Sequence, residues 1–347
     1  MTEEYHASQI PLQYPEEQKN LAAFLAAHEL TYEADIEAAF GILDTSDSLV
    51  ACGCAAGPLL KCFAVNPELR GQNALGILVS SLTQERFSAG YYDLFVVTRR
   101  KNELQFINCG LYPVVHTDQL VLLENRIDGP KAFTDPLYRR GDDQCTVGAV
   151  VMNCDPFTLG HQALAEYAAS QCDVLHIFVL SASSSFAPPD VRYRLAVEGT
   201  KHLAHVRVHM GGMYIISSAT FPTYFLKKNE DAAALQMELD LTLFSNCIAP
   251  ALHITKRFAG QEPLDPVTAK YNDTMKRILP QHGIDFIEIP RISLDGHVIS
   301  ASQVRRLFQK RGACKEVLDL VPEPTKRYLE NRAALELTPA ASGKGSA

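Results

Sequence analysis

Positive charge is scarce in this sequence. Its 347 residues include 32 Lys and Arg against 40 Asp and Glu, giving a formal net charge of −8 at pH 7, and the isoelectric point lies near 5.8. Proteins that bind nucleic acid or a membrane surface usually present a basic patch, and the sequence has no basic stripe with interleaved aromatic residues. The composition therefore argues against nucleic acid and against a membrane as partners.

Long apolar runs are also missing. No run approaches the length that spans a bilayer, and residues 1–10, MTEEYHASQI, are acidic and lack the apolar stretch of a secretory signal. The nine cysteines are odd in number and stand mostly in or beside apolar runs, which is typical of reduced thiols. We therefore expect a cytoplasmic protein.

Three cysteines stand close together in the sequence, at Cys52, Cys54 and Cys62. A zinc site would need a fourth ligand, and Cys-x-Cys is not the usual zinc spacing. Alternation along a strand predicts small buried thiols at these positions instead. We therefore assign no metal ligand to the protein.

The chain is long enough for two domains, each with its own core. Residues 36–127 carry mixed strand and helix patterns, which predict a compact α+β unit. Residues 128–143, DGPKAFTDPLYRRGDD, have the composition of a linker. We expect a first domain with its linker at 1–141, a second at 142–337, and a disordered Ala/Gly/Ser-rich tail at 338–347.

Strand and helix patterns alternate from residue 145 onward, which indicates a parallel sheet with ligands at the carboxyl ends of its strands. An extra amphipathic helix is predicted at 231–247. The predicted strands are 147–152, 174–180, 206–210, 253–258 and 284–289, and the predicted helices are 162–170, 189–203, 266–279 and 303–309.

The most informative motif is Cys154-Asp155-Pro156-Phe157-Thr158-Leu159-Gly160-His161, between a predicted strand and a predicted helix. One nucleotidyltransferase superfamily grips the α-phosphate of ATP with such a strand, a Pro-bearing turn and Thr-x-Gly-His. The helix start offers backbone N–H groups to a phosphate, and Gly160 allows close approach because it has no Cβ. His161 can donate to an oxygen that gains charge during transfer.

A second motif, Ile299-Ser300-Ala301-Ser302-Gln303-Val304-Arg305, follows another apolar run. Ser302 is predicted to cap the helix 303–309. Its first-turn amides and Arg305 would form a second anion site, suited to the β- and γ-phosphates. Two such helix starts in one alternating region indicate a reaction at phosphorus.

The second domain closely resembles the citrate (pro-3S)-lyase ligase family. The resemblance covers nearly all of residues 145–310 and runs through VGAVVMNCDPFTLGHQALAEYAASQCDVLHIFVL, MYIISSATFPTYFLK, ITKRFAGQEPLDPVTAKYN and ISASQVRRLF. It implies an α/β protein: an acetyltransferase-like (GNAT-like) α+β domain, then a Rossmann-like parallel-sheet nucleotidyltransferase domain of the HxGH type. It also implies an acid–thiol ligase, which forms acetyl-AMP and pyrophosphate from acetate and ATP. The acetyl group then passes to a thiol on the acyl carrier subunit of citrate lyase, which activates that enzyme.

The resemblance further implies that the acceptor thiol belongs to a phosphoribosyl-dephospho-coenzyme A group. Residues 66–75 stand where acetyltransferase-like domains carry a glycine-rich turn, whose amides contact the coenzyme A pyrophosphate. Asn73 and Leu75 occupy glycine places there, so the cradle is altered or lost. The first domain is therefore expected either to receive the prosthetic arm or to be structural.

Acetate is ionised at pH 7 and needs no general base, so the site is expected to neutralise charge, align the reactants and exclude water. Thr158 and His161 are assigned to the α-phosphate, and Arg305 with the Ser302 region to the pyrophosphate. Mg²⁺ would bridge phosphate oxygens with few protein ligands. The remaining assignments are Asn153, Asp155, Phe157, Gly160 and Ser300 for ATP, and Arg192, Ser217, Ser218 and Thr220 for the acid.

Three other functions share these motifs. The acceptor could be the carrier protein of a malonate decarboxylase. The enzyme could be a nucleotidyltransferase acting on phosphopantetheine or a mononucleotide, although this leaves the first domain unexplained. A catalytically inactive ATP-binding regulator is the third, and it conflicts with intact Thr158, His161 and Arg305.

Overall fold

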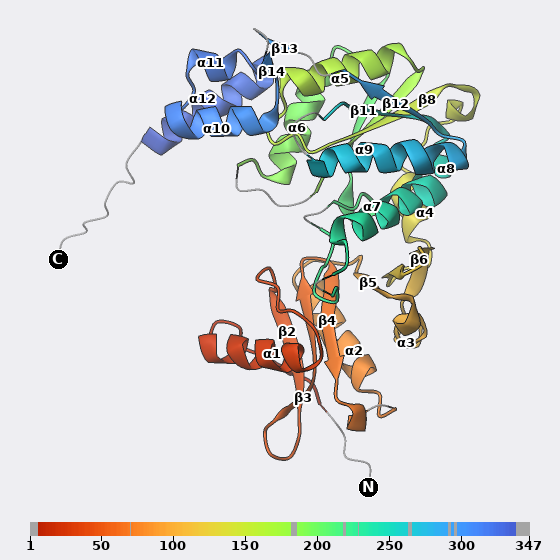
Figure 1. Ribbon diagram of the computed structural model, residues 1–347, viewed down its shortest axis with the longest axis vertical. Helices are drawn as coiled ribbons and strands as arrows, with labels where there is room; N and C mark the ends of the chain where they lie inside the picture. The colour runs from red at the N-terminus through yellow and green to blue at the C-terminus, as the bar shows by residue number, and fades with distance from the viewer. Residues whose placement is uncertain are drawn as a thin grey trace, which may run out of the picture. The chain divides into compact units, whose positions relative to one another are not determined.

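The computed structural model describes residues 6–69, 71–181, 186–217, 220–227, 229–262, 266–290, 293–294 and 297–337. By its internal contacts the chain divides into two compact units (Figure 1). The first comprises residues 1–133 and 216–247, and the second comprises 134–215 and 248–347. The sequence prediction placed 216–247 in the second domain, whereas these residues pack with the first unit.

A seven-stranded mixed sheet forms the centre of the first unit, in the order β1-β2-β3-β4-β5-β7-β6. β4 and β5 run parallel and share only the pair Leu59–Phe95, whereas the other neighbouring strands are antiparallel. The strands are β1 (Ser8–Gln9), β2 (Ala38–Leu43), β3 (Leu49–Ala56), β4 (Leu59–Val65), β5 (Phe95–Arg99), β6 (Tyr112–His116) and β7 (Leu120–Glu124). Its helices are α1 (Pro15–Ala27), α2 (Ala74–Ser88), α3 (Glu103–Ile107) and α7 (Ala232–Leu243), and α4 (Gly129–Thr134) lies at the boundary.

The two faces of this sheet are covered by different helices. Val79 and Leu82 of α2 pack with Ala55 of β3 on one face. Leu21 and Leu25 of α1 pack with a second cluster that includes the alternate β3 residues. Because successive strand side chains point to opposite faces, this alternation leaves both faces of β3 buried.

The buried thiols of the first unit lie in the cluster beneath α1. Cys52, Cys54 and Cys62 are each fully buried, as the strand alternation predicts. Burial raises the pKa of the Cys52 thiol. For Cys54, a hydrogen bond with the Cys62 side chain raises the pKa most, and burial adds to it. The three thiols fill a core.

The second unit is built on a five-stranded sheet in the order β10-β9-β8-β11-β12, with every neighbouring pair parallel. The order reverses beside β8, so the carboxyl ends of β8 and β11 flank the crevice where such sheets bind ligands. The strands are β8 (Val147–Met152), β9 (Val174–Val179), β10 (Val206–Met210), β11 (Ile254–Gly260) and β12 (Asp285–Ile289). A separate two-stranded pair consists of β13 (Ser293–Leu294) and β14 (His297–Val298).

Helices cover this sheet and extend beyond it. Ala165 and Ala168 of α5 pack with Leu195 of α6 against the strands, and a further core joins α10 to α12 (Figure 1). The helices are α5 (Leu159–Ser170), α6 (Pro189–Thr200), α8 (Ala249–Ala251), α9 (Pro266–Ile278), α10 (Ala301–Arg311), α11 (Lys315–Leu318) and α12 (Glu323–Leu337). The predicted architecture, an α+β part followed by a Rossmann-like parallel-sheet part, is confirmed.

A polar cluster lies on β9 and β10, away from the crevice motifs. His176 is fully buried, and its Nδ1 lies 2.9 Å from Nε2 of His209. Burial, the larger cause, and the neighbouring imidazole lower the pKa of His176 to about 3. Burial and Arg207 lower the pKa of His209 to about 4. Arg207 itself donates two hydrogen bonds to Asp142, at 2.6 and 2.9 Å.

Candidate active site

The start of α5 is organised by a capping box. Thr158 is the N-cap residue, with extended backbone, and its hydroxyl accepts a hydrogen bond from the backbone N–H of His161 at 3.4 Å. In return, the backbone N–H of Thr158 donates to Nδ1 of His161 at 3.0 Å. The box usually has Glu or Gln at this third helical position. In this protein the imidazole of His161 accepts that hydrogen bond instead.

This reciprocal bond sets the tautomer of His161. A backbone N–H can only donate, so Nδ1 must accept, and the neutral ring carries its proton on Nε2. The Thr158 hydroxyl also lies 3.0 Å from Nδ1, which adds a second contact at the same ring atom. His161 therefore presents an N–H donor at Nε2 while its other nitrogen holds the helix start. A donor of this kind suits an oxygen that gains negative charge.

Phe157 and Gly160 set the place of this turn. The Phe157 side chain is fully buried in the core, where its ring stacks on His161 with centroids 5.7 Å apart. A Cβ on Gly199 would lie 2.4 Å from the Phe157 ring, and a Cβ on Gly160 would lie 3.1 Å from the Ile299 carbonyl oxygen. Phe157 was assigned to ATP, but its buried side chain packs against His161 and Gly199. The Phe157 ring therefore contacts His161 from within the core.

Fewer backbone donors remain at the start of α5 than the sequence predicts. The N–H of Leu159 donates to the Leu320 carbonyl at 3.0 Å, and that of His161 is taken by Thr158. Among the described residues, the N–H of Gly160 has no hydrogen-bond partner. Of these three backbone amides, that of Gly160 is therefore the one that remains open.

Asp155 connects this turn with two other segments. It is buried, with 5% of its surface exposed, and its Oδ1 accepts a hydrogen bond from the N–H of Ala187 at 3.0 Å. Arg305 donates to the backbone carbonyl of Asp155 and lies 3.5 Å from its Oδ2. The same guanidinium donates to the Ser302 hydroxyl at 3.1 Å. Arg305 thus joins the two sequence motifs.

The second motif corrects one prediction. The N-cap of α10 is Ser300, whose hydroxyl accepts from the N–H of Gln303 at 3.1 Å, and Ser302 lies in the first turn. The reason is the Ser-x-x-Gln spacing of Ser300 and Gln303, which matches a capping box, whereas Ser302 has Arg305 at that distance. The N–H groups of Ala301 and Ser302 have no hydrogen-bond partner in the described part of the chain.

Arg192 was assigned to the acid, and this assignment stays a prediction. Its side chain is fully buried. Its Nη1 donates to the backbone carbonyl of Asn153 at 3.0 Å and also to Oδ1 of Asn153. Burial lowers the pKa of the guanidinium, and the carboxylate of Asp155 and then Cys154 partly offset this. The Asn153 side chain itself is exposed.

Two of the residues assigned to the acid pocket contact each other. Ser217 and Thr220 belong to the first unit, where the Ser217 N–H donates to the Thr220 hydroxyl at 3.0 Å. This bond forms a local polar turn. Ser218 lies outside the described residues, as do Ser183, Ser184 and Ser185 ahead of Arg192. The grouped site residues are therefore those of the β8–α5 turn, Arg192 and the start of α10.

The turn before α2 in the first unit differs from a phosphate cradle. Asn73 precedes the helix with φ of 59° and makes no side-chain cap hydrogen bond. A Cβ on Gly76 would lie 2.3 Å from the Asn73 Oδ1, so the Asn73 side chain lies over the first turn of the helix. An asparagine tolerates this left-handed backbone, but its side chain fills the space that glycine would leave open.

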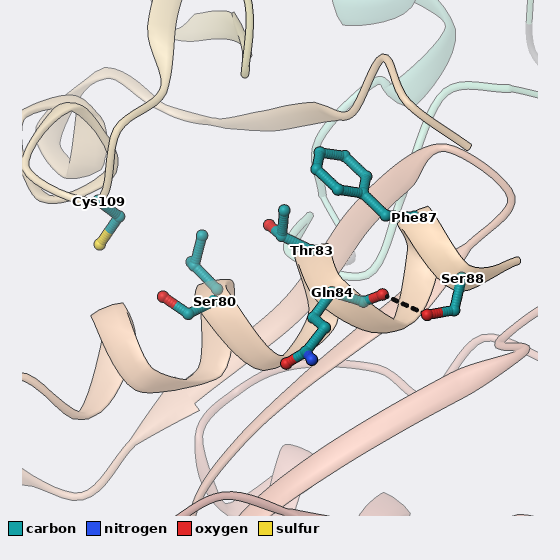
Figure 2. Close-up of a pocket in the computed structure, with 7 residues that line it drawn as sticks. Ser80, Thr83, Gln84, Phe87, Ser88 and Cys109 are labelled. Atoms are coloured by element: carbon teal, nitrogen blue, oxygen red, sulfur yellow. Dashed lines mark hydrogen bonds between the residues drawn. The ribbon is translucent and has the colours of Figure 1, made fainter. Parts of the chain in front are cut away.

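A pocket of about 590 Å³ lies further along the same helix. Figure 2 shows Ser80, Thr83, Gln84 and Phe87 on one side of α2, with Cys109 across from them. The Ser88 hydroxyl donates to the Gln84 carbonyl at 3.0 Å. The pocket includes no residue of either phosphate motif, and it carries no charged side chain.

Some contributors to the site had no signal in the sequence. Leu320 caps the first amide of α5, Ala187 holds Asp155, and buried Thr325 donates to the Phe157 carbonyl at 2.8 Å. Each acts through the fold rather than through a local motif. Within the described residues, no group of three His, Cys, Asp or Glu side chains could hold a metal ion.

This chain is similar to known proteins. The family model of the citrate lyase ligase C-terminal domain matches residues 147–329. A citrate (pro-3S)-lyase ligase of Klebsiella pneumoniae is 39% identical over 318 residues, which is 90% of this chain and 92% of that protein. The Escherichia coli K12 protein of the same name is 35% identical and covers 90% of each chain.

One of the solved structures that this chain resembles is that of Thermotoga maritima TmcAL bound with alpha-thio ATP. It is 16% identical with a TM-score of 0.36, and the match covers 55% of this chain and 56% of that chain. At this score the likeness carries no weight for function. No helix of the described residues is both long and apolar enough to cross a membrane.

Proposed function

Because the chain belongs to the citrate lyase ligase family, we propose that it activates acetate with ATP and passes the acetyl group to the acyl carrier subunit of citrate lyase. The acceptor is the thiol of a phosphoribosyl-dephospho-coenzyme A group on that subunit. The enzyme is a ligase, and its action activates citrate lyase. The nine cysteines are all free, which fits the reducing cytoplasm in which we expect it to work.

Acetyl-adenylate formation comes first in this proposal. A carboxylate oxygen of acetate attacks the α-phosphorus of ATP, the bond to the bridging oxygen breaks, and pyrophosphate leaves. Acetate is already ionised, so no residue has to remove a proton. His161 Nε2–H and Gly160 N–H donate to the α-phosphate oxygens, whose charge grows in the transition state.

The leaving pyrophosphate requires positive charge and open donors. The first turn of α10 offers the N–H groups of Ala301 and Ser302, and the partly exposed Arg305 lies beside them. In the proposed complex Arg305 exchanges part of its contact with Asp155 for a phosphate oxygen. Charge-assisted hydrogen bonds of this kind are about twice as strong as neutral ones.

Thiol acetylation completes the reaction. The carrier thiol loses its proton to solvent, and its sulfur attacks the acetyl carbonyl. The bond to the AMP oxygen breaks, leaving a thioester and AMP. The bound mixed anhydride must be kept from water meanwhile, because hydrolysis would waste it.

Mg²⁺ would be held chiefly by the phosphate oxygens of the nucleotide. The described residues contain no cluster of three acidic or imidazole ligands, and the Asp155 carboxylate already accepts from Ala187 and pairs with Arg305. This donor set fits an ion that arrives with ATP and keeps several waters. When bound, the ion neutralises phosphate charge.

The observation that carries the proposal is the Arg305 guanidinium, which joins Asp155 of the first motif to Ser302 of the second. This contact supports one shared site for two helix starts with open N–H groups. A triphosphate needs such paired anion sites.

Exchange of pyrophosphate into ATP tests the proposal. With Mg²⁺ present, exchange should require acetate, since labelled ATP forms only when pyrophosphate attacks the acetyl-adenylate. Exchange that required phosphopantetheine or a mononucleotide would instead identify a nucleotidyltransferase. Acetate-dependent exchange with acetylation of a malonate decarboxylase carrier, and not of the citrate lyase carrier, would change the partner alone.

A further inference from the structure

Arg192 is an unusual residue for its position. It lies on α6 with its side chain fully buried, and burial lowers the pKa of its guanidinium. A buried cation costs free energy unless its hydrogen bonds and a counter-charge compensate. The carboxylate of Asp155 lies close enough to oppose this fall in pKa. We therefore expect this buried cation to position a neighbouring residue.

The group that it holds is Asn153, the first residue after β8. A single nitrogen, Nη1 of Arg192, donates both to the backbone carbonyl and to the side-chain carbonyl of Asn153. One contact fixes the backbone of this residue and the other fixes its side-chain torsions. Cys154, which follows, has a left-handed φ of 54°, so the chain turns sharply at this point.

The contact also settles which way the Asn153 amide points. A guanidinium N–H can only donate, so the amide oxygen must face Arg192. The NH2 group therefore faces away from Arg192, on a side chain that is exposed. Within the described residues, Nδ2 has no hydrogen-bond partner. The two N–H donors stand at the carboxyl end of β8, where a parallel sheet binds its ligand.

We propose that Arg192 is a positioning residue that presents the Asn153 NH2 group as a donor to the nucleotide phosphates. This rests on the proposed function, because it takes the β8–α5 turn as the nucleotide site. Arg192 does not contact the substrate, since its side chain is fully buried. Its effect passes through Asn153, which adds to the donors of Gly160 and His161.

The first test replaces Asn153 with aspartate. Asn153→Asp keeps an oxygen toward Arg192 and strengthens that pair, but it exchanges the donor NH2 for a negatively charged oxygen. The melting temperature should stay equal or rise. The affinity for a non-hydrolysable ATP analogue with Mg²⁺, measured by calorimetry, should fall about tenfold or more, because a carboxylate would face phosphate. Unchanged affinity would overturn the proposal.

The second test is a double-mutant cycle of Asn153→Ala and Arg192→Lys. Lysine keeps the charge but loses the planar fork of donors. Arg192→Lys alone should weaken analogue binding about fivefold, and less than twofold when Asn153 is already alanine, because contacting residues are not additive. Additive effects would show that Arg192 acts by another route. If Arg192→Lys does not fold, the Asn153→Asp result decides, since that variant leaves Arg192 in place.

These readouts separate the two proposals. Pyrophosphate exchange without acetate dependence in the wild-type protein would refute the proposed function, while the binding cycle would still report on Arg192. Suppose that the wild-type protein shows acetate-dependent exchange and that the two substitutions have additive effects on analogue binding. That result would refute the positioning role of Arg192 alone. An analogue that fails to bind the wild-type protein would overturn both.

Discussion

Three helix starts in this protein look alike in sequence and differ in structure. The starts of α5 and α10 are capped by Thr158 and Ser300, whose hydroxyls each accept a first-turn N–H. The start of α2 follows a glycine-bearing turn, yet Asn73 makes no such bond and lies over the helix instead. A phosphate site therefore depends on which N–H groups remain open after capping, and not on the presence of a turn with glycine.

The two capped starts differ from each other at the third helical position. At α5 this residue is His161, whose Nδ1 accepts from the Thr158 N–H, and at α10 it is Gln303. An imidazole has a second nitrogen on its far side, so it can cap the helix and donate to a ligand at once. We expect α5 to serve the reacting phosphate and α10 to serve the leaving group.

The largest expected effect therefore belongs to His161. His161→Ala should lower the rate of acetate-dependent exchange by about a hundredfold or more, the usual loss for one oxyanion donor. Affinity for ATP should change much less, because the donor acts chiefly in the transition state. His161→Asn is the matched control. Its side-chain oxygen can still accept from the Thr158 N–H, so this variant should retain stability, but its exchange rate should fall to the same extent as that of His161→Ala. Full activity of either variant would disprove the α-phosphate assignment.

Arg305 should show a different pattern from His161. Arg305→Ala should weaken ATP binding by about tenfold as well as slow exchange, because the guanidinium is proposed to contact ground-state phosphates. Arg305→Lys should recover only part of the affinity, since lysine cannot bridge Asp155 and Ser302 together. Calorimetry with the ATP analogue measures the loss. An unchanged affinity in Arg305→Ala would limit this residue to the Asp155 contact.

The buried imidazole pair of the second unit predicts a pH dependence. In the unfolded chain these rings take up protons below about pH 6.5, whereas burial lowers the folded pKa of His176 to about 3 and of His209 to about 4. Between these limits the unfolded state binds more protons, so stability falls as pH drops from 6.5 toward 4. Urea unfolding at several pH values measures the slope. His176→Gln should reduce it, and an unaltered slope would assign the acid sensitivity to other groups.

A smaller effect separates Ser300 from Ser302. Ser300→Ala removes the N-cap and should lower the free energy of unfolding by about 1 kcal/mol. Ser302→Ala, two residues further on, should cost less than half as much in unfolding experiments, because its hydroxyl caps no amide. Equal losses would mean that the cap assignment at α10 fails.

The smallest effect is expected at the start of α2. Asn73→Ala should leave acetate-dependent exchange within about twofold of wild type, because this turn is not proposed to bind ATP. Its left-handed φ of 59° should make the alanine variant slightly less stable, since asparagine tolerates this backbone better than alanine does. Asn73→Gly is the control that relieves this strain. A large loss of exchange in both variants would mean that the first unit takes part in the ATP step.

The sequence predicts local features of this site well and long-range ones poorly. The Thr-x-Gly-His motif follows its strand as expected because caps and turns depend on neighbouring residues. The Ser300 cap also had a local signal, the Ser-x-x-Gln spacing, which the choice of Ser302 overlooked. The burial of Arg192 has no local signal, because it results from how α6 packs beneath the β8–α5 turn.

The same limit applies to the fold. The predicted strands of the parallel sheet lie close to the observed ones, since apolar runs of this length are typical of buried strands. Helix α7 was predicted from its spacing, but its spacing cannot say which core it joins. Its contacts place it with the first unit, through packing on β6 and β7. The sequence pattern predicts that a helix or strand exists, and tertiary contacts decide which unit it belongs to.

The return of residues 216–247 to the first unit has a consequence for folding and for proteolysis. The polypeptide passes between the units three times, after residues 133, 215 and 247, so a protease that cleaves one passage produces two fragments, and at least one unit then contains residues from both. β8 pairs with β11 across this excursion, which makes the central pairing of the parallel sheet a contact between distant parts of the chain. Such pairings form slowly because a long loop must close first. We expect the two fragments of a nicked chain to stay associated through packing within the unit that they share, and the second sheet to be the later of the two to assemble.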